Sequence, residues 1–126
     1  IPVGVCHGDL TLSNILFSAN GFYLIDFLDS FLETPLQDVV KLRQDTAFNW
    51  SGLMYSGAYD KVRHDLVLKF MDRKIEEAFS GYQWYREAYG VFQLLNFLRI
   101  LQYAREPKVI NYLKKTINSL LVNYET

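Results

Sequence analysis

Two short apolar runs open the chain, and longer helical patterns follow them. Residues 15–17 and 22–25 are apolar and are separated by Ser-Ala-Asn-Gly, in which the Asn20-Gly21 pair tolerates the positive φ angles of a tight turn. This pattern predicts a β-hairpin whose turn is centred near Asn20. Antiparallel pairing about that centre would set Asn14 opposite Asp26 at the open end of the hairpin.

After Pro35 the spacing of apolar residues changes to that of a helix. The positions that mark this first helix are Leu36, Val39, Val40 and Leu42. Asp38 falls in its first turn, where a carboxylate suits the positive end of the helix dipole.

Three longer helices are predicted over residues 58–79, over residues 82–103 and from Pro107 onward. The residues of the first that should face inward are Val62, Leu66, Phe70 and Ile75. The second is apolar around most of its circumference, which is typical of a central helix. The third carries its apolar stripe on Ile110, Leu113, Ile117, Leu120, Leu121 and Tyr124. The predicted fold class is therefore α+β and mostly α, with a loop and a small hairpin followed by a helical bundle.

Composition and charge restrict the possible functions. The chain has 126 residues, 50% of them hydrophobic, which indicates one packed domain. A net charge of -1 gives no electrostatic footprint for nucleic acid or for a membrane surface, so neither partner is predicted. The single cysteine, Cys6, excludes an internal disulfide, and a cytoplasmic location is the expectation.

Three polar side chains should meet at the open end of the predicted hairpin. Asn14 and Asp26 lie there by register, and Asp9 lies on a loop that can fold back toward them. Carboxylate and amide oxygens suit Mg²⁺, which keeps several waters and bridges substrate phosphates. A further carboxylate, free of metal, can orient a hydroxyl and accept its proton. The competing interpretation, a set of turn and cap residues, is opposed by Asp26, because an unpaired carboxylate inside an apolar strand would be costly.

These residues resemble a known family. H-G-D-L at residues 7–10, with Asn14, resembles the catalytic loop H-R-D-L-x-x-x-N of protein kinases. I-D-F at residues 25–27 looks like the metal-binding acid that follows that loop. This form, followed by a helix that opens L-Q-D-V-V at residues 36–40, is closer to the aminoglycoside phosphotransferase and choline kinase branch.

The resemblance implies a role for each residue of the motif. Asp9 would be the catalytic base, and Asn14 and Asp26 would bind Mg²⁺, with ATP as co-substrate. His7 and Asp38 would support the loop. The fold that it implies for residues 1–126 is the C-terminal lobe of a kinase-like phosphotransferase.

Departures from the protein-kinase pattern refine this expectation. Gly8 stands where protein kinases have an Arg that pairs with a phosphorylated segment, which favours a small-molecule kinase. Leu28 replaces the Gly of D-F-G, and Asp29 is either a further contact to the metal or a cap of the next turn.

The sequence has no G-x-G-x-x-G and no strand lysine to pair with nucleotide phosphates. We therefore expect the N-terminal nucleotide-binding lobe to be absent from this chain and the chain alone to be inactive. Apolar surface left exposed by that lobe predicts self-association, as a homodimer.

The leading hypothesis is transfer of the γ-phosphate of ATP to a hydroxyl of a small molecule that is aminoglycoside-, choline- or sugar-like. One alternative is a metal-dependent phosphohydrolase built from His7, Asp9 and Asp26, for which the second histidine, His64, is distant in sequence. The other is a non-catalytic module, either pseudokinase-like or a helical interaction domain.

Overall fold

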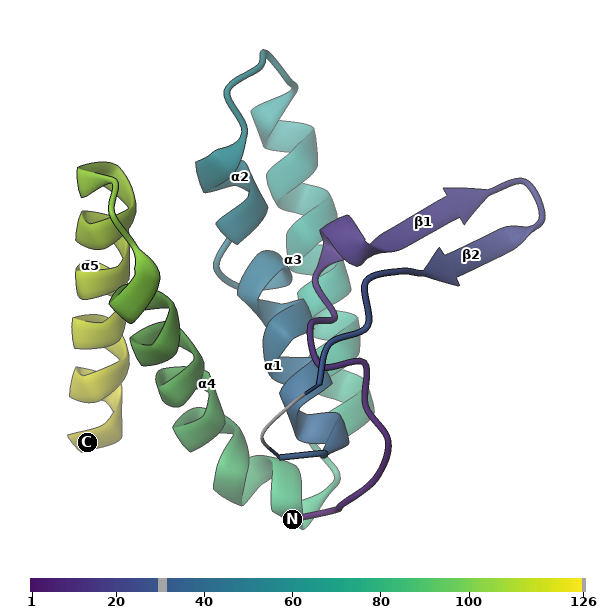
Figure 1. The fold of residues 1–126 in the computed structure, drawn as a ribbon, viewed down its shortest axis with the longest axis vertical. Helices are drawn as coiled ribbons and strands as arrows, with labels where there is room; N and C mark the ends of the chain where they lie inside the picture. The colour runs from purple at the N-terminus through teal and green to yellow at the C-terminus, as the bar shows by residue number, and fades with distance from the viewer. Residues whose placement is uncertain (30–31, 126) are drawn as a thin grey trace.

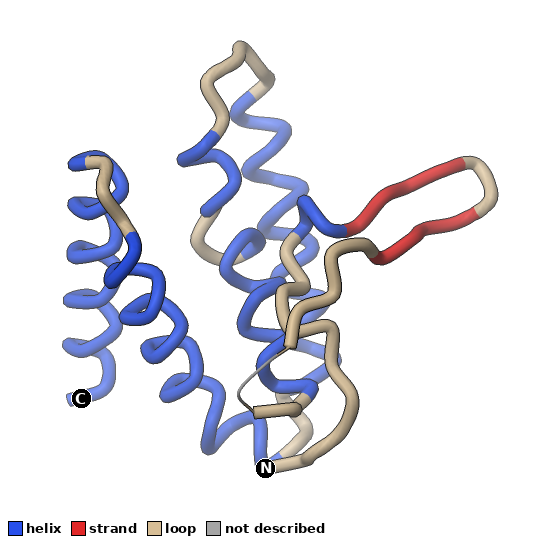
Figure 2. The backbone as a smooth tube through the Cα atoms, viewed as in Figure 1, coloured by secondary structure: helices blue, strands red, loops and turns tan. Residues whose placement is uncertain are grey.

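A hairpin projects from a body of helices in the computed structural model, which describes residues 1–29 and 32–125 (Figure 1). A 3₁₀ turn at Leu12–Asn14 leads into a two-stranded antiparallel sheet, β1 (Ile15–Ser18) and β2 (Gly21–Leu24). The helices that follow are α1 (Pro35–Thr46), α2 (Trp50–Met54), α3 (Lys61–Phe79), α4 (Gln83–Tyr103) and α5 (Pro107–Glu125). Figure 2 shows the two strands extending away from the helices, so the predicted class, α+β and mostly α, is confirmed. Among the described residues, no helix combines the length and apolar character needed to cross a membrane.

The hairpin forms as predicted, but its register differs by one residue. Ser18 pairs with Gly21 and Ile15 pairs with Leu24, so Asn14 lies opposite Ile25 and not opposite Asp26. The reason is the turn, which contains the two residues Ala19 and Asn20 and is therefore centred between them.

The first helix, α1, begins where the sequence predicts. Thr34 caps it by accepting a hydrogen bond from the Leu36 N–H, and Pro35 occupies its first turn, where no N–H is needed. The predicted apolar positions Leu36, Val39 and Val40 are buried in the core. This helix packs against α2, α3 and α4 and so forms the centre of the body.

Helix α3 buries a face that differs from the predicted one. It begins at Lys61, after the side chain of Asp60 accepts a hydrogen bond from the Arg63 N–H, and it therefore starts later than residue 58. Val62, Leu66 and Phe70, predicted to face inward, are 71%, 63% and 54% exposed. Leu68 is buried instead, and Ile75 packs against the core as predicted.

The choice of face on α3 follows from a polar contact with α1. Arg43 donates from Nε and Nη2 to the two oxygens of Asp72 at 2.8 and 2.9 Å. Its Nη1 donates to Glu76 and to the Tyr85 hydroxyl, each at 2.6 Å. Burial alone would lower the pKa of Arg43, but the hydrogen bond to Asp72 and the charge interactions with Tyr89, Tyr85 and Asp72 together outweigh that effect, and the pKa lies above its usual value. A buried guanidinium needs these partners, and they turn the Asp72 side of α3 toward α1.

Replacing Arg43 with Met should lower the free energy of unfolding by about 2 kcal/mol, because Asp72 would stay in the helix interface without its cation. This value lies below that for a fully buried pair, since the side chains of Arg43 and Asp72 retain 14% and 20% exposure. Urea denaturation followed by circular dichroism measures it. The control is Arg63→Met at an exposed position of α3, which should stay within about 0.5 kcal/mol of the wild type. An equally small effect at Arg43 would contradict the prediction.

Two apolar clusters fill the body, one on each side of α4. The first joins α1 with α4 and consists of Leu36, Val39, Val40, Tyr85 and Phe92. The second joins α4 with α5 and consists of Phe97, Val109, Leu113 and Ile117. Contact on both sides agrees with the predicted central position of α4. The predicted stripe on α5 is only partly correct, because Leu121 and Tyr124 are 41% and 57% exposed.

Candidate active site

Helix α1 holds both ends of the loop that precedes β1. The carboxylate of Asp38 accepts hydrogen bonds from the backbone N–H groups of His7 and Gly8 at 2.7 and 2.9 Å. Two turns later on the same helix, Asp45 Oδ2 accepts the Leu12 N–H at 2.7 Å. Residues seven apart lie on one face of a helix, so a single face of α1 fixes the path of this loop.

His7 connects the two halves of the motif. The residue is 4% exposed, and its Nδ1 accepts the backbone N–H of Asp9 at 3.2 Å. Because Nδ1 is an acceptor, Nε2 carries the proton and donates it to the Ile25 carbonyl at 2.6 Å. The Phe27 ring lies against the imidazole, with centroids 4.4 Å apart. The buried His7 ring thus ties the loop of Asp9 to the segment that contains Asp26.

The carboxylate of Asp9 has a partner on each oxygen. Lys41 Nζ lies 3.4 Å from Oδ1, and Asn14 Nδ2 lies 3.3 Å from Oδ2. Asn14 Nδ2 also donates to the backbone carbonyl of Asp9 at 2.8 Å. These two hydrogen bonds fix the orientation of the Asn14 amide.

The backbone of Asp26 lies next to that of Asn14 at the open end of the hairpin. The N–H of Ile25 donates to the Asn14 carbonyl at 3.0 Å, and Asp26 follows directly. Its backbone has φ 56°, in the left-handed region, which for a residue other than glycine is uncommon and is enriched at functional sites. The sequence places Asp26 inside an apolar strand, but β2 ends at Leu24 and the Asp26 side chain is exposed.

The side chains of Asn14 and Asp26 are of the kinds that bind a hydrated divalent cation. They offer one amide oxygen and one exposed carboxylate, and Mg²⁺ takes few protein ligands because it keeps waters and binds substrate phosphates. Within residues 1–29 and 32–125, no group of three or more His, Cys, Asp or Glu side chains is placed to hold a metal ion.

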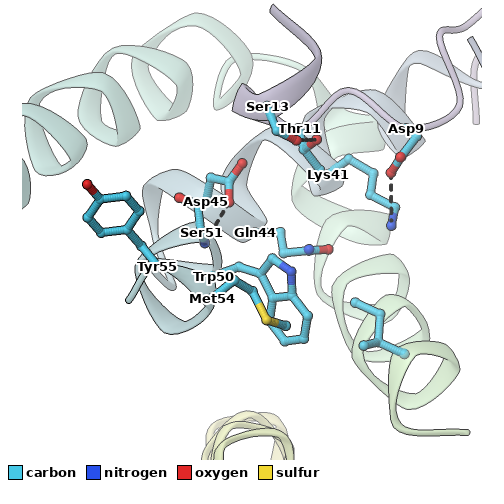
Figure 3. Close-up of a pocket in the computed structure, with 11 residues that line it drawn as sticks. Asp9, Thr11, Ser13, Lys41, Gln44, Asp45, Trp50, Ser51, Met54 and Tyr55 are labelled. Atoms are coloured by element: carbon cyan, nitrogen blue, oxygen red, sulfur yellow. Dashed lines mark hydrogen bonds and ion pairs between the residues drawn. The ribbon is translucent and has the colours of Figure 1, made fainter. Parts of the chain in front are cut away.

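A cleft of about 510 Å³ opens beside Asp9 (Figure 3). Asp9 and Lys41 lie on one part of its wall, and Trp50, Met54 and Tyr55 lie on another. The second group comes from α2 and the residue after it, an element that the sequence analysis does not predict.

Asp45 joins this wall to the loop. Its Oδ1 accepts the Ser51 N–H at 3.1 Å, while Oδ2 holds Leu12, and the residue is only 1% exposed. Lys41 and Asp45 are functional candidates that the sequence analysis missed. Their spacing from Asp38, three and seven residues on one helix, is the signal that could have found them.

Cys6 is adjacent to the motif but does not have the character of a nucleophile. Burial raises the pKa of its thiol, and the nearby carboxylate of Asp38 raises it further. The thiol is therefore neutral at physiological pH.

A carboxylate on a fixed loop, followed by an Asn and by an acid beyond a hairpin, on a helical body, is the arrangement of a kinase-like phosphotransferase. A comparison with known protein families matches residues 1–87 to the phosphotransferase enzyme family. The chain belongs to the phosphotransferase enzyme family. This confirms the family expected from residues 7–40. No curated protein and no solved structure gave a significant match.

Proposed function

We propose that the chain is the C-terminal lobe of an ATP-dependent kinase that phosphorylates a hydroxyl group of a small molecule. The observation that carries the proposal is the position of Asp9. Its carboxylate is 35% exposed at the wall of a cleft and is held from both sides by Lys41 and Asn14. A hydroxyl in that cleft has a fixed acceptor for its proton within reach.

Each group at the site has a part in this reaction. Asp9 orients the acceptor hydroxyl and takes its proton as the oxygen attacks phosphorus. Lys41 keeps the carboxylate turned toward the cleft, and Asp38 and His7 keep the loop in place. Asn14 Oδ1 and Asp26 would hold Mg²⁺, which when bound neutralises charge on the nucleotide phosphates.

The contacts of His7 disfavour a metal-dependent phosphohydrolase. Such a centre would use His7 as a ligand, but Nδ1 accepts the Asp9 N–H and Nε2 donates to the Ile25 carbonyl. Neither ring nitrogen has a lone pair left for a metal.

The non-catalytic alternative differs in its response to nucleotide. If the proposal is correct, Mg²⁺ with ATP should raise the melting temperature of the chain, and ATP without Mg²⁺ should raise it less. Ligand at 100 times its Kd stabilises a protein by about 2.7 kcal/mol. Asp26→Asn should remove the part of the shift that depends on Mg²⁺, because a neutral amide binds that ion poorly.

The matched control is Glu33→Gln, which removes the same charge at an exposed position near the site. It should retain the full shift. An unchanged melting temperature in the wild type would instead support the non-catalytic module, and an equal Mg²⁺ effect in Asp26→Asn would remove Asp26 from the site.

Turnover by the 126 residues alone should be slow, because the sequence has no glycine-rich loop and no strand lysine to position the nucleotide phosphates. We expect a rate well below the roughly 1–100 s⁻¹ of kinases.

A further inference from the structure

The wall of the cleft opposite the ion pair is aromatic and apolar. Trp50, Met54, Tyr55 and Ile100 form it, and the Tyr55 side chain is 56% exposed. Three of them, Trp50, Met54 and Ile100, also line a second hollow of about 430 Å³ toward the turn between α4 and α5. Apolar surface of this kind gains free energy when a ligand removes it from water.

The carboxylates of the cleft already have partners in the protein. Asp9 has Lys41 on one oxygen and Asn14 on the other. Asp45 accepts one backbone N–H on each oxygen and is almost fully buried. Among the described residues that line the cleft, Asp9 keeps lone pairs for a neutral hydroxyl, but its charge is already offset by Lys41, so a ligand ammonium would compete with Lys41 and be repelled by it.

Two hydroxyl groups on the wall lie next to each other. Thr11 Oγ1 and Ser13 Oγ are hydrogen bonded to each other at 2.8 Å. This pair is exposed to solvent, so a ligand hydroxyl that binds it only replaces water and gains little net free energy. The wall thus favours a ligand with few polar groups.

We infer that the phosphoryl acceptor is an alcohol with a flat apolar body, and that this body lies on Trp50 and Met54 while its hydroxyl reaches Asp9. The inference rests on the proposed function, because it assigns the cleft to the acceptor. It selects one class of acceptor over amino alcohols, aminoglycosides and sugars.

Fluorescence of Trp50 provides a direct test. The chain has two tryptophans, Trp50 in the cleft and Trp84 on α4, so Trp84→Phe leaves the cleft residue as the reporter. The probes are 2-phenylethanol, choline, kanamycin and glucose, each titrated while the emission of Trp50 is recorded. We expect 2-phenylethanol to bind with a Kd about tenfold lower than that of each other probe, which corresponds to about 1.4 kcal/mol.

Two exposed tyrosines supply the matched variants in the Trp84→Phe background. Tyr55→Ala removes part of the cleft wall and should raise the Kd of 2-phenylethanol several-fold. Tyr124→Ala removes a side chain of nearly equal exposure, 57% against 56%, outside the residues that line the cleft, and should leave the Kd unchanged. If Trp84→Phe does not fold, isothermal titration of the wild-type chain with the same probes replaces the fluorescence measurement.

Tighter binding of choline, kanamycin or glucose than of 2-phenylethanol would overturn the inference, and so would the absence of binding by every probe. Equal effects of the two tyrosine variants would also overturn it. None of these results depends on the Mg²⁺-dependent nucleotide shift, which tests the proposed function. A failure of the acceptor inference can therefore be distinguished from a failure of the proposed function.

Discussion

Asp9→Asn is expected to slow phosphoryl transfer by about 10²- to 10⁴-fold, the range for loss of a general base. The amide keeps the size of the side chain and an oxygen that can accept from Asn14. It loses the charge that faces Lys41 and the ability to take the proton of the acceptor. The rate should therefore fall while the loop keeps its backbone contacts to Asp38.

Transfer of radiolabelled phosphate from ATP measures this effect even when turnover is slow. The acceptor is the alcohol that binds most tightly to the cleft, and the Mg²⁺-dependent shift with nucleotide shows whether the remaining site is intact. Asp65→Asn is the matched control, because its side chain is 40% exposed against 35% for Asp9 and it lies on α3. Equal rates for wild type and Asp9→Asn would exclude Asp9 as the base.

Gly8→Ala is expected to lower the free energy of unfolding by about 3 kcal/mol. Gly8 has φ +88°, a conformation that costs an L-residue about 1–2 kcal/mol. A Cβ atom at this position would lie 1.9 Å from the carbonyl oxygen of Leu28, so the Leu28 backbone would have to move. Overpacking of this kind costs about 1–3 kcal/mol more.

The same movement would separate the two halves of the motif. The Leu28 N–H donates to the His7 carbonyl at 2.9 Å, and a displaced backbone would lose that bond. The Mg²⁺-dependent nucleotide shift should therefore weaken together with stability. Gly4→Ala is the control, because a Cβ there meets no atom within 4 Å. Urea denaturation of both variants measures the difference, and a Gly8→Ala protein as stable as Gly4→Ala would contradict the steric argument.

Gly8 illustrates how sequence and structure give different reasons for one residue. From the sequence, its place in the kinase-like loop indicates the loss of an Arg that would pair with a phosphorylated segment. The structure adds that the Leu28 carbonyl occupies the space of any side chain. This contact joins residues 20 positions apart, and the motif contains no sign of it.

Asp38 and Asp45 differ in whether the sequence alone could identify them as site residues. The sequence singles out Asp38 because it falls in the first turn of a helix that follows a recognisable motif. Asp45 lies in the same helix and holds Leu12, yet its partner is 33 residues away and no local rule connects them. No local rule predicts the role of Lys41 either, since its pairing with Asp9 exists only once α1 packs beneath the loop.

The sequence by itself determined the kinds of element, their order and the motif residues, because turn chemistry, helix periodicity and caps act between near neighbours. Only the tertiary structure decided the hairpin register, the face that α3 buries and the wall that α2 gives to the cleft. The register follows from which two residues form the turn, whereas the buried face of α3 and the cleft wall depend on contacts between elements, such as Arg43 with Asp72 and Asp45 with Ser51 and Leu12. Burial makes such contacts strong, and no pattern along the chain records which of them will form.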